Sequence, residues 1–167
     1  MKKKSTILVA AVIAALAVGV AVLAVLNDRD AGEKREQLRD EYFVIHADVA
    51  ECSTEYKVTM EEFLALGPVE FEANYKKSGK APETRVYTGV PFAEVLRMKG
   101  IDPAQFSSAS FMAADKYGQV LSMKDALDEE NCFIAADDSG DGPFRMILPK
   151  DQFSQRWVKL LTDVHLR

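Results

Sequence analysis

The sequence predicts an α+β domain preceded by one long apolar helix. Near the N-terminus, 20 successive residues from Ile7 to Leu26 carry neither a charge nor a side-chain hydrogen-bonding group. The chain that follows has about 140 residues, the size of one domain, and contains many short strand patterns interspersed with three short helix patterns. This irregular order is typical of mixed β-sheets with short helices and not of a doubly wound parallel sheet.

The apolar run is interpreted as a transmembrane helix. A helix rises about 1.5 Å per residue, so the run spans roughly 30 Å, the thickness of the hydrocarbon core of a bilayer. Lys2, Lys3 and Lys4 precede it, and the positive-inside rule keeps such residues in the cytoplasm. We therefore expect residues 1–6 in the cytoplasm, residues 7–26 as a single-pass anchor in the cell membrane, and the C-terminal domain on the extracytoplasmic side.

A cleaved signal peptide is the alternative interpretation of this run. Signal peptides have an apolar region of about 7–15 residues followed by a small-x-small cleavage site. Gly19-Val20-Ala21 would serve as that site, but cleavage there leaves the apolar residues from Val22 to Leu26 on the mature chain. The length of the run favours an uncleaved signal anchor, and both interpretations export the domain.

The charge of the exported part argues against nucleic acid as a partner. Three of the 21 lysine and arginine residues precede the apolar run and no acidic residue does, which leaves 18 basic against 26 acidic residues. Affinity for nucleic acid comes from neutralising phosphates, which an acidic surface does not do. The membrane, through the N-terminal helix, is the expected partner, together with a membrane or periplasmic protein.

Local patterns predict the first elements after the anchor. Residues 27–41 are charged and compatible with a helix, and we expect a stalk there, followed by a domain at residues 42–167. Two strand patterns occupy residues 42–60 around a turn near residues 51–55. Thr59 and Glu62 have the spacing of a capping box, which predicts a short helix that ends at Gly67-Pro68.

The rest of the chain continues the same mixture. Alternation predicts strands at residues 69–75, 84–90, 108–115, 131–137, 144–149 and 156–167. Pro91 and Gly100 bracket a second helix, and Ser122 with Asp125 marks the start of a third.

The two cysteines, Cys52 and Cys132, are interpreted as separate buried thiols, although an exported protein can also form a disulfide. With only two histidines, His46 and His165, and no Cys-x-x-Cys, the sequence gives little support to a zinc or haem site.

Four stretches in order resemble the molybdopterin-binding oxidoreductase domain of the sulfite oxidase type. Each is weak alone, but their order and spacing carry the similarity from about Phe43 to the end of the chain. The stretches are "YTGVPFAEVL" (87–96), "FMAADKYGQVLSMKDALD" (111–128), "FIAADDSGDGPFRMILP" (133–149) and "RWVKLLTDVHL" (156–166). The resemblance implies a sulfite oxidase-type fold.

One departure from the family changes the expected chemistry. The catalytic members bind molybdenum through a cysteine in an early strand, and that position falls at or near Ala73 in this chain. A methyl group cannot ligate a metal, whereas a soft metal needs a thiolate. The resemblance therefore favours a small exported version of the fold that binds a pterin without a metal.

The residues that match the family motifs are the candidate ligand-binding residues, and no catalytic or metal-binding residue is assigned. A pterin is a flat ring with a donor–acceptor edge, so it calls for a carboxylate, a stacking aromatic and a few polar groups. Arg145 is the strongest candidate, because a guanidinium between apolar neighbours must face a cavity or a partner. The candidates are Asn74, Tyr75, Lys77, Asp115, Tyr117, Arg145, Trp157 and Lys159.

Three functions remain open from the sequence. The first is a membrane-anchored, non-catalytic module that binds a pterin, with molybdopterin as one form, and passes a ligand or signal to a partner. The second is a molybdopterin-dependent oxidoreductase or a subunit of one, which the missing cysteine disfavours. The third is a partner-binding scaffold with no ligand, because a fold does not imply a function.

Overall fold

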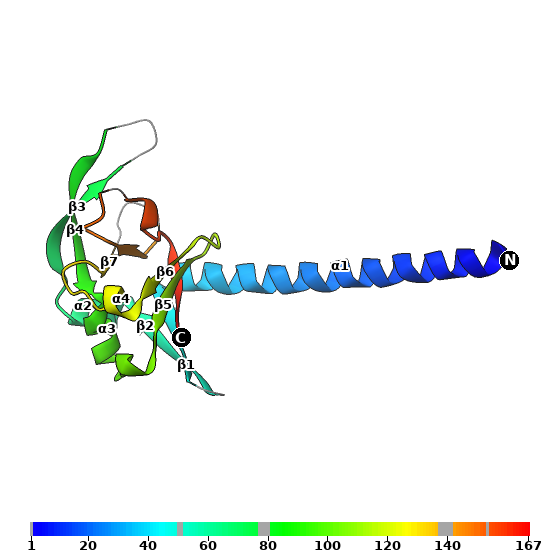
Figure 1. Cartoon of the computed structure of the whole chain (residues 1–167), viewed down its shortest axis with the longest axis horizontal. Helices are drawn as coiled ribbons and strands as arrows, with labels where there is room; N and C mark the ends of the chain where they lie inside the picture. The colour runs from blue at the N-terminus through cyan, green and yellow to red at the C-terminus, as the bar shows by residue number, and fades with distance from the viewer. Residues whose placement is uncertain (1, 50–51, 77–80, 137–141, 153) are drawn as a thin grey trace. The chain divides into compact units, whose positions relative to one another are not determined.

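The computed structural model describes residues 2–49, 52–76, 81–136, 142–152 and 154–167, with side chains from residue 15 onward except residue 30. The chain divides into two compact units, Met1–Glu36 and Gln37–Arg167. Helix α1 (Lys2–Arg39) makes up the first unit and enters the second (Figure 1).

The apolar side chains of α1 are exposed from residue 15 to residue 26. All residues from 15 to 29 are exposed, and Leu16, Val20 and Leu23 have 65–67% of their surface accessible. Residues 7–14 of the expected anchor lie outside the described side chains. Among the side chains that are described, no helix is long and apolar enough to cross a membrane.

Two β-sheets form the framework of the second unit. The five-stranded sheet has the order β2-β1-β9-β5-β6, and the four-stranded sheet has the order β3-β4-β7-β8. Neighbouring strands are antiparallel except β1 and β9, which are parallel. The strands are β1 (Tyr42–Val49), β2 (Cys52–Thr59), β3 (Val69–Tyr75), β4 (Glu83–Pro91), β5 (Ser108–Ala113), β6 (Gly118–Ser122), β7 (Phe133–Ala136), β8 (Phe144–Ile147) and β9 (Leu161–Leu166).

Residues at their N-termini mark where the three short α-helices of the described second unit begin. In α2 (Met60–Ala65) the Thr59 side chain and the Glu62 side chain each bond the other's backbone N–H, so the predicted capping box is confirmed. Helix α3 (Phe92–Met98) follows Pro91, and α4 (Met123–Ala126) is capped by the Ser122 hydroxyl. Two 3₁₀ turns complete the set, η1 (Pro103–Gln105) and η2 (Ser154–Arg156).

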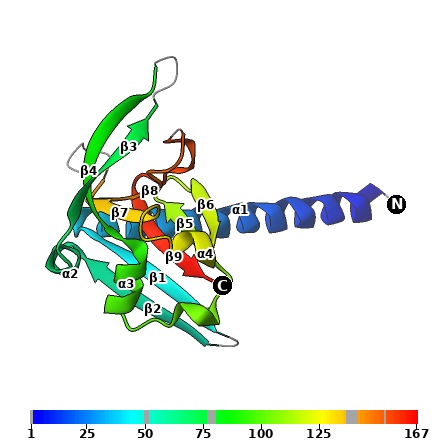
Figure 2. The same ribbon diagram turned by 60° about the vertical axis from the view of Figure 1, so that its left-hand side comes forward.

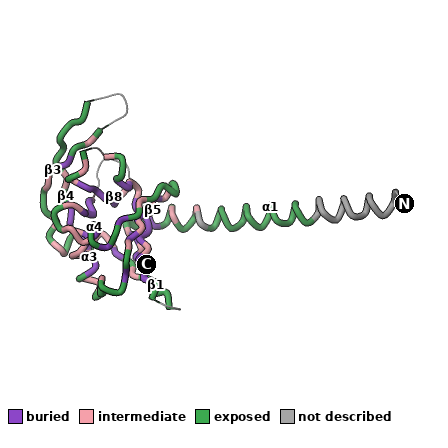
Figure 3. The backbone as a smooth tube through the Cα atoms, viewed as in Figure 1, coloured by how far each residue is buried: buried purple, intermediate pink, exposed green. Residues whose placement is uncertain are grey.

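The hydrophobic core lies between the two sheets. Phe43 of β1 meets Phe144 of β8 edge to face, with ring centroids 5.0 Å apart, and Phe63 of α2 meets the same ring at 5.3 Å. On the other flank, Phe92 of α3 packs on Phe111 of β5 at 4.9 Å. Figure 3 shows the buried stretches in the strands of the second unit. The expectation of a mixed α+β domain with short helices is confirmed.

The last strand and the first hairpin differ from the sequence prediction. The predicted strand at residues 156–167 is wrong in its first half, because η2 ends at Arg156 and Leu160 has a positive φ of 51° before β9 begins. The first turn also comes earlier than expected, since Cys52 already pairs with Val49. Trp157 therefore lies in the β8–β9 connection (residues 148–160) and not in a strand.

Candidate functional site

Three aromatic and three basic side chains gather at the four-stranded sheet and the β8–β9 connection. We refer to them as the cation–aromatic cluster, which consists of Tyr75, Tyr87, Trp157, Arg85, Arg145 and Lys159.

The register of the β3–β4 hairpin places part of this cluster on one face of the sheet. Ala73 pairs with Arg85, and Phe71 pairs with Tyr87. Because successive side chains along a strand point to opposite faces, Tyr75 lies on the same face as Arg85 and Tyr87.

Strand pairing places Arg145 of β8 on that same face, two strands away from β4. Ala135 of β7 pairs with Gly89 on one side and with Arg145 on the other, so all three share the face of Tyr87. Gly89 itself is closely packed, because a Cβ there would meet the Ile134 carbonyl oxygen at 2.6 Å and the Phe71 ring at 3.0 Å. The Arg145 guanidinium extends to within 5.9 Å of the Tyr87 ring centroid.

Trp157 is the centre of the aromatic part of the cluster. Its ring lies edge to face with Tyr87, with centroids 5.4 Å apart, and 6.3 Å from Tyr75. The indole is buried, and its Nε1–H donates to the Leu148 carbonyl at 3.3 Å. Since its polar atom is already bonded, Trp157 offers a ligand only its ring surface and also contributes to the core.

The basic side chains surround the two tyrosines. The Arg85 guanidinium lies 4.0 Å from the Tyr75 ring centroid, and the Lys159 ammonium lies 5.8 Å from it. Cations at these distances from a ring face are attracted by its quadrupole. Arg85 also forms an ion pair with the exposed Glu83, whereas Arg145 is only 3% exposed.

Burial sets the electrostatics of the inner part of the cluster. It lowers the pKa of Arg145, because the charged guanidinium loses hydration. It raises the pKa of Tyr87, because the charged form of that residue, the phenolate, would also lose hydration. The Tyr87 hydroxyl oxygen is buried and makes no hydrogen bond of good geometry within the described residues, although the Arg85 and Arg145 guanidiniums lie close enough to favour its ionised form. A hydroxyl donor and a guanidinium beside aromatic rings are groups that can bind acceptor atoms or negative charge on a flat ligand.

Polar contacts hold the β8–β9 connection against the sheet and the β5–β6 turn. The Tyr117 hydroxyl donates to the Gln155 carbonyl at 2.6 Å. The Ser154 hydroxyl accepts from the backbone N–H of Lys76 at 3.2 Å and donates to its carbonyl at 3.3 Å. These contacts fix the segment that carries Trp157 and Lys159.

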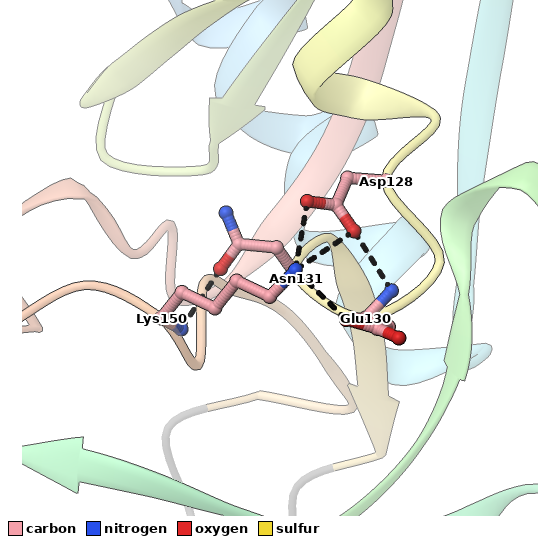
Figure 4. Close-up of polar contacts among 4 residues, drawn as sticks. All are labelled: Asp128, Glu130, Asn131 and Lys150. Atoms are coloured by element: carbon pink, nitrogen blue, oxygen red, sulfur yellow. Dashed lines mark hydrogen bonds and ion pairs between the residues drawn. The ribbon is translucent and has the colours of Figure 1, made fainter.

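A second set of contacts fixes the start of the same connection (Figure 4). The Lys150 ammonium lies 3.0 Å from Asp128 and 3.1 Å from Glu130, while the Lys150 backbone N–H donates to the Asn131 side chain at 2.8 Å. The ammonium holds the pKa of Asp128 below its usual value. The groups are partly exposed, so the ion pairs position the backbone more than they stabilise the domain.

Four of the eight predicted residues come together in the cation–aromatic cluster. These are Tyr75, Arg145, Trp157 and Lys159.

The other four predicted residues lie elsewhere. Asn74 is on the opposite face of β3 from Tyr75, and its amide oxygen accepts from the Thr84 hydroxyl at 3.3 Å. Asp115 accepts from the backbone N–H of Tyr117 at 3.0 Å, which shapes the β5–β6 turn, and the Tyr117 hydroxyl contacts the β8–β9 connection. Lys77 lies outside the described residues.

The sequence prediction missed Arg85 and Tyr87. Both belong to the pattern "TRVYTGV", which predicts a strand but not which strand lies next to it. The one available signal was alternation, since residues 85, 87 and 89 must share a face. Only the pairing of Ala73 with Arg85 shows that this face is the one beside Tyr75.

A pocket lies beside Ala73, the position at which the resembled family would have its molybdenum-binding cysteine. The pocket, of about 200 Å³, is lined by Glu72, Ala73, Asn74, Thr84 and Pro149. Both cysteines are free: Cys132 is fully buried in the core, where burial raises its pKa, and Cys52 is exposed on β2 of the other sheet. The predicted burial is therefore confirmed for Cys132 and wrong for Cys52.

Two further observations concern the described part of the chain. A larger and mostly apolar pocket of about 290 Å³ lies at α3, and none of the predicted ligand-binding residues lines it. No group of three or more His, Cys, Asp or Glu side chains among the described residues is arranged to hold a metal ion.

The fold and the cluster define an α+β domain with a basic, aromatic site on one sheet. The chain matches no protein-family model, and no curated protein sequence is significantly similar to it.

Proposed function

We propose that the domain is an exported, membrane-anchored, non-catalytic module that binds a flat anionic ligand of the pterin type. The cation–aromatic cluster is the observation that carries this proposal. Aromatic rings bind a flat heterocycle by stacking. Guanidinium groups donate hydrogen bonds to acceptor edges and neutralise an acidic side chain.

The inner part of the cluster favours an anion in particular. Burial makes the charged form of Arg145 less favourable, and a bound anion would offset that loss of hydration. The Tyr87 hydroxyl would gain a bond that no described residue supplies with good geometry. Both groups face the same side of the sheet, so one ligand can contact them together.

The cysteines favour a binding module over a molybdenum enzyme. Ala73 supplies no ligand atom, the Cys132 thiol is enclosed in the core, and Cys52 belongs to the other sheet. We further infer a sulfite oxidase-type fold, for which the resemblance of the sequence and the two mixed sheets with short helices are the support.

The membrane anchor is part of the same proposal. Its support is the uncharged run from Ile7 to Leu26, with three lysines before it, and the exposure of the apolar side chains from residue 15 onward. Exposed apolar side chains on all sides of a helix call for a lipid or protein surround.

Binding of pterin-6-carboxylate, a fluorescent anionic pterin, to the full-length chain in detergent tests the function. We expect saturable quenching of the pterin fluorescence and no stoichiometric molybdenum by elemental analysis. Arg145→Ala should weaken binding by more than about tenfold, which corresponds to about 1.4 kcal/mol. Arg85 is exposed and Lys159 half-buried, so Arg85→Gln and Lys159→Gln test the same cluster if Arg145→Ala does not fold. Arg97→Gln at α3 is the matched control.

Three other outcomes would contradict the proposed binding function or its site. Stoichiometric molybdenum would support the oxidoreductase instead. Absence of binding to any pterin would favour the scaffold, and equal affinity of wild type and all three cluster variants would remove the site assignment.

A further inference from the structure

The two histidines of the chain lie against each other, away from the cation–aromatic cluster. His46 of β1 pairs with His165 of β9, and their rings are stacked with centroids 4.4 Å apart and an interplanar angle of 9°. β1 and β9 run side by side in Figure 2. The sequence contains two histidines in total, so both are in this pair.

A carboxylate lies near each ring nitrogen of His46. Its Nε2 lies 3.1 Å from Asp163 of β9, and its Nδ1 lies 3.4 Å from Glu55 of β2. Carboxylates in their ionised form only accept hydrogen bonds, and a neutral imidazole has a single N–H to donate. Both ring nitrogens of His46 lie near a carboxylate, and the hydrogen bond is the one between Nε2 and Asp163.

His165 has a different environment although it is adjacent. His46 and Arg167 disfavour a positive charge on it, whereas Asp163 and Asp48 favour one. On the other neighbouring strand, β5, the residue opposite His165 is the uncharged Ser110.

Lys57 of β2 is a further charged residue on this face of the sheet. It lies opposite Val44, one row along the same sheet face, and its ammonium is 3.6 Å from the Tyr42 ring centroid.

The pair lies where two parts of the five-stranded sheet join. The β1–β2 hairpin is connected to β9, β5 and β6 by the parallel β1–β9 ladder, which extends over Val44–Ala47 and Asp163–Leu166. His46 and His165 form one of the four residue pairs in this ladder. We refer to the β1–β9 contact as the seam.

We infer that the stacked histidines make the seam sensitive to acid, so that protonation of His165 beside His46 loosens the β1–β2 hairpin from the rest of the sheet. Two like charges at stacking distance repel, and at His165 the effect of His46 is larger than the opposing effect of either Asp163 or Asp48.

The direction of the pH dependence follows from the environment of His165. Burial, and then the charge of His46, lower its pKa below the ordinary value of 6.5. A histidine with a lowered pKa binds its proton more tightly in the unfolded chain than in the fold. Its contribution to stability is therefore complete above pH 6.5 and is lost as the pH falls below that value.

Thermal unfolding of the full-length chain in detergent at pH 7.5 and pH 5.5 tests the inference. Histidine is the side chain whose ordinary pKa lies in this range, and both histidines of the chain belong to the stacked pair. We expect the wild-type midpoint to fall by about 3–6 °C. The fall should be less than half as large in His165→Gln and also reduced in His46→Gln, where the adjacent charge is absent.

Amide hydrogen exchange on the wild type supplies a readout that needs no variant. After correction for intrinsic rates, β1 and β2 should lose protection at pH 5.5 while β4 and β7 retain it. A pH-independent midpoint, the full wild-type fall in both variants, or equal loss of protection in all strands would overturn the inference.

Discussion

Tyr87 carries a buried hydroxyl that makes no hydrogen bond of good geometry within the described residues, although most buried polar groups in folded proteins are paired. Such a group reduces stability, because its hydration is lost on folding and is not replaced. The Tyr87 ring contacts Trp157 and Arg145 in the cation–aromatic cluster, and under the proposed function the hydroxyl would donate to the ligand.

This reasoning predicts opposite effects of Tyr87→Phe on stability and binding. The variant should unfold with a free energy unchanged or raised by up to about 1 kcal/mol, because it removes an unbonded buried oxygen. Its affinity for pterin-6-carboxylate should fall about three- to tenfold, since one hydrogen bond is lost. Urea denaturation and fluorescence titration measure the two quantities.

Tyr117→Phe is the matched control for that prediction. Its hydroxyl donates to the Gln155 carbonyl at 2.6 Å, so its removal should lower the free energy of unfolding by about 1 kcal/mol. If both variants change stability in the same direction and by the same amount, the distinction between the two hydroxyls is wrong.

Among the elements, α2 shows how local residues decide where a helix begins. Thr59 and Glu62 bond each other's backbone N–H, and Glu62 also pairs with the Lys99 ammonium at 2.6 Å. The Lys99 contact, with the Thr59 bonds, holds the pKa of Glu62 below its usual value. The helix therefore starts at residue 60, and Phe63 points into the core.

Thr59→Ala should lower the free energy of unfolding by about 1 kcal/mol, because the first turn of α2 loses its cap. Thr54→Ala, on the exposed part of β2, should change it by less than about 0.5 kcal/mol. Circular dichroism in a urea series measures both, and equal effects would show that the cap does not contribute.

The sequence was informative where structure depends on neighbours in the chain. The capping residues of α2 and α4 and the alternation of β3 were predicted correctly because each depends on a few adjacent side chains. The cluster was predicted only in part, since Arg85 reaches Tyr75 through strand pairing that alternation cannot show. Trp157 was assigned to a strand because alternation continues through a connection that is not extended.

At the scale of the whole chain, composition separates the two units. The second unit has a closed core, whereas the described apolar side chains of α1 from residue 15 to residue 26 are exposed. Three lysines precede the apolar run, and in the proposed single-pass arrangement they would keep that end of the chain in the cytoplasm.

The proposed anchor predicts that the full-length chain floats with lipid vesicles in a density gradient and stays with them in 1 M salt. A variant without residues 2–26 should remain at the bottom of the gradient, because the apolar run is absent. Release of the full-length chain by salt would indicate attachment by charge alone, and flotation of the shortened chain would contradict the anchor.

The parallel β1–β9 ladder has a consequence for the order in which the protein is made. β1 can pair with β2 as soon as both have been synthesised, but its other edge meets a partner 119 residues later, as with Val44 and Asp163. During that interval the hairpin presents an open edge on which other chains can add strands. A chain that is threaded through a membrane from its N-terminus would need that edge shielded until β9 emerges, which gives a periplasmic chaperone a defined segment to bind.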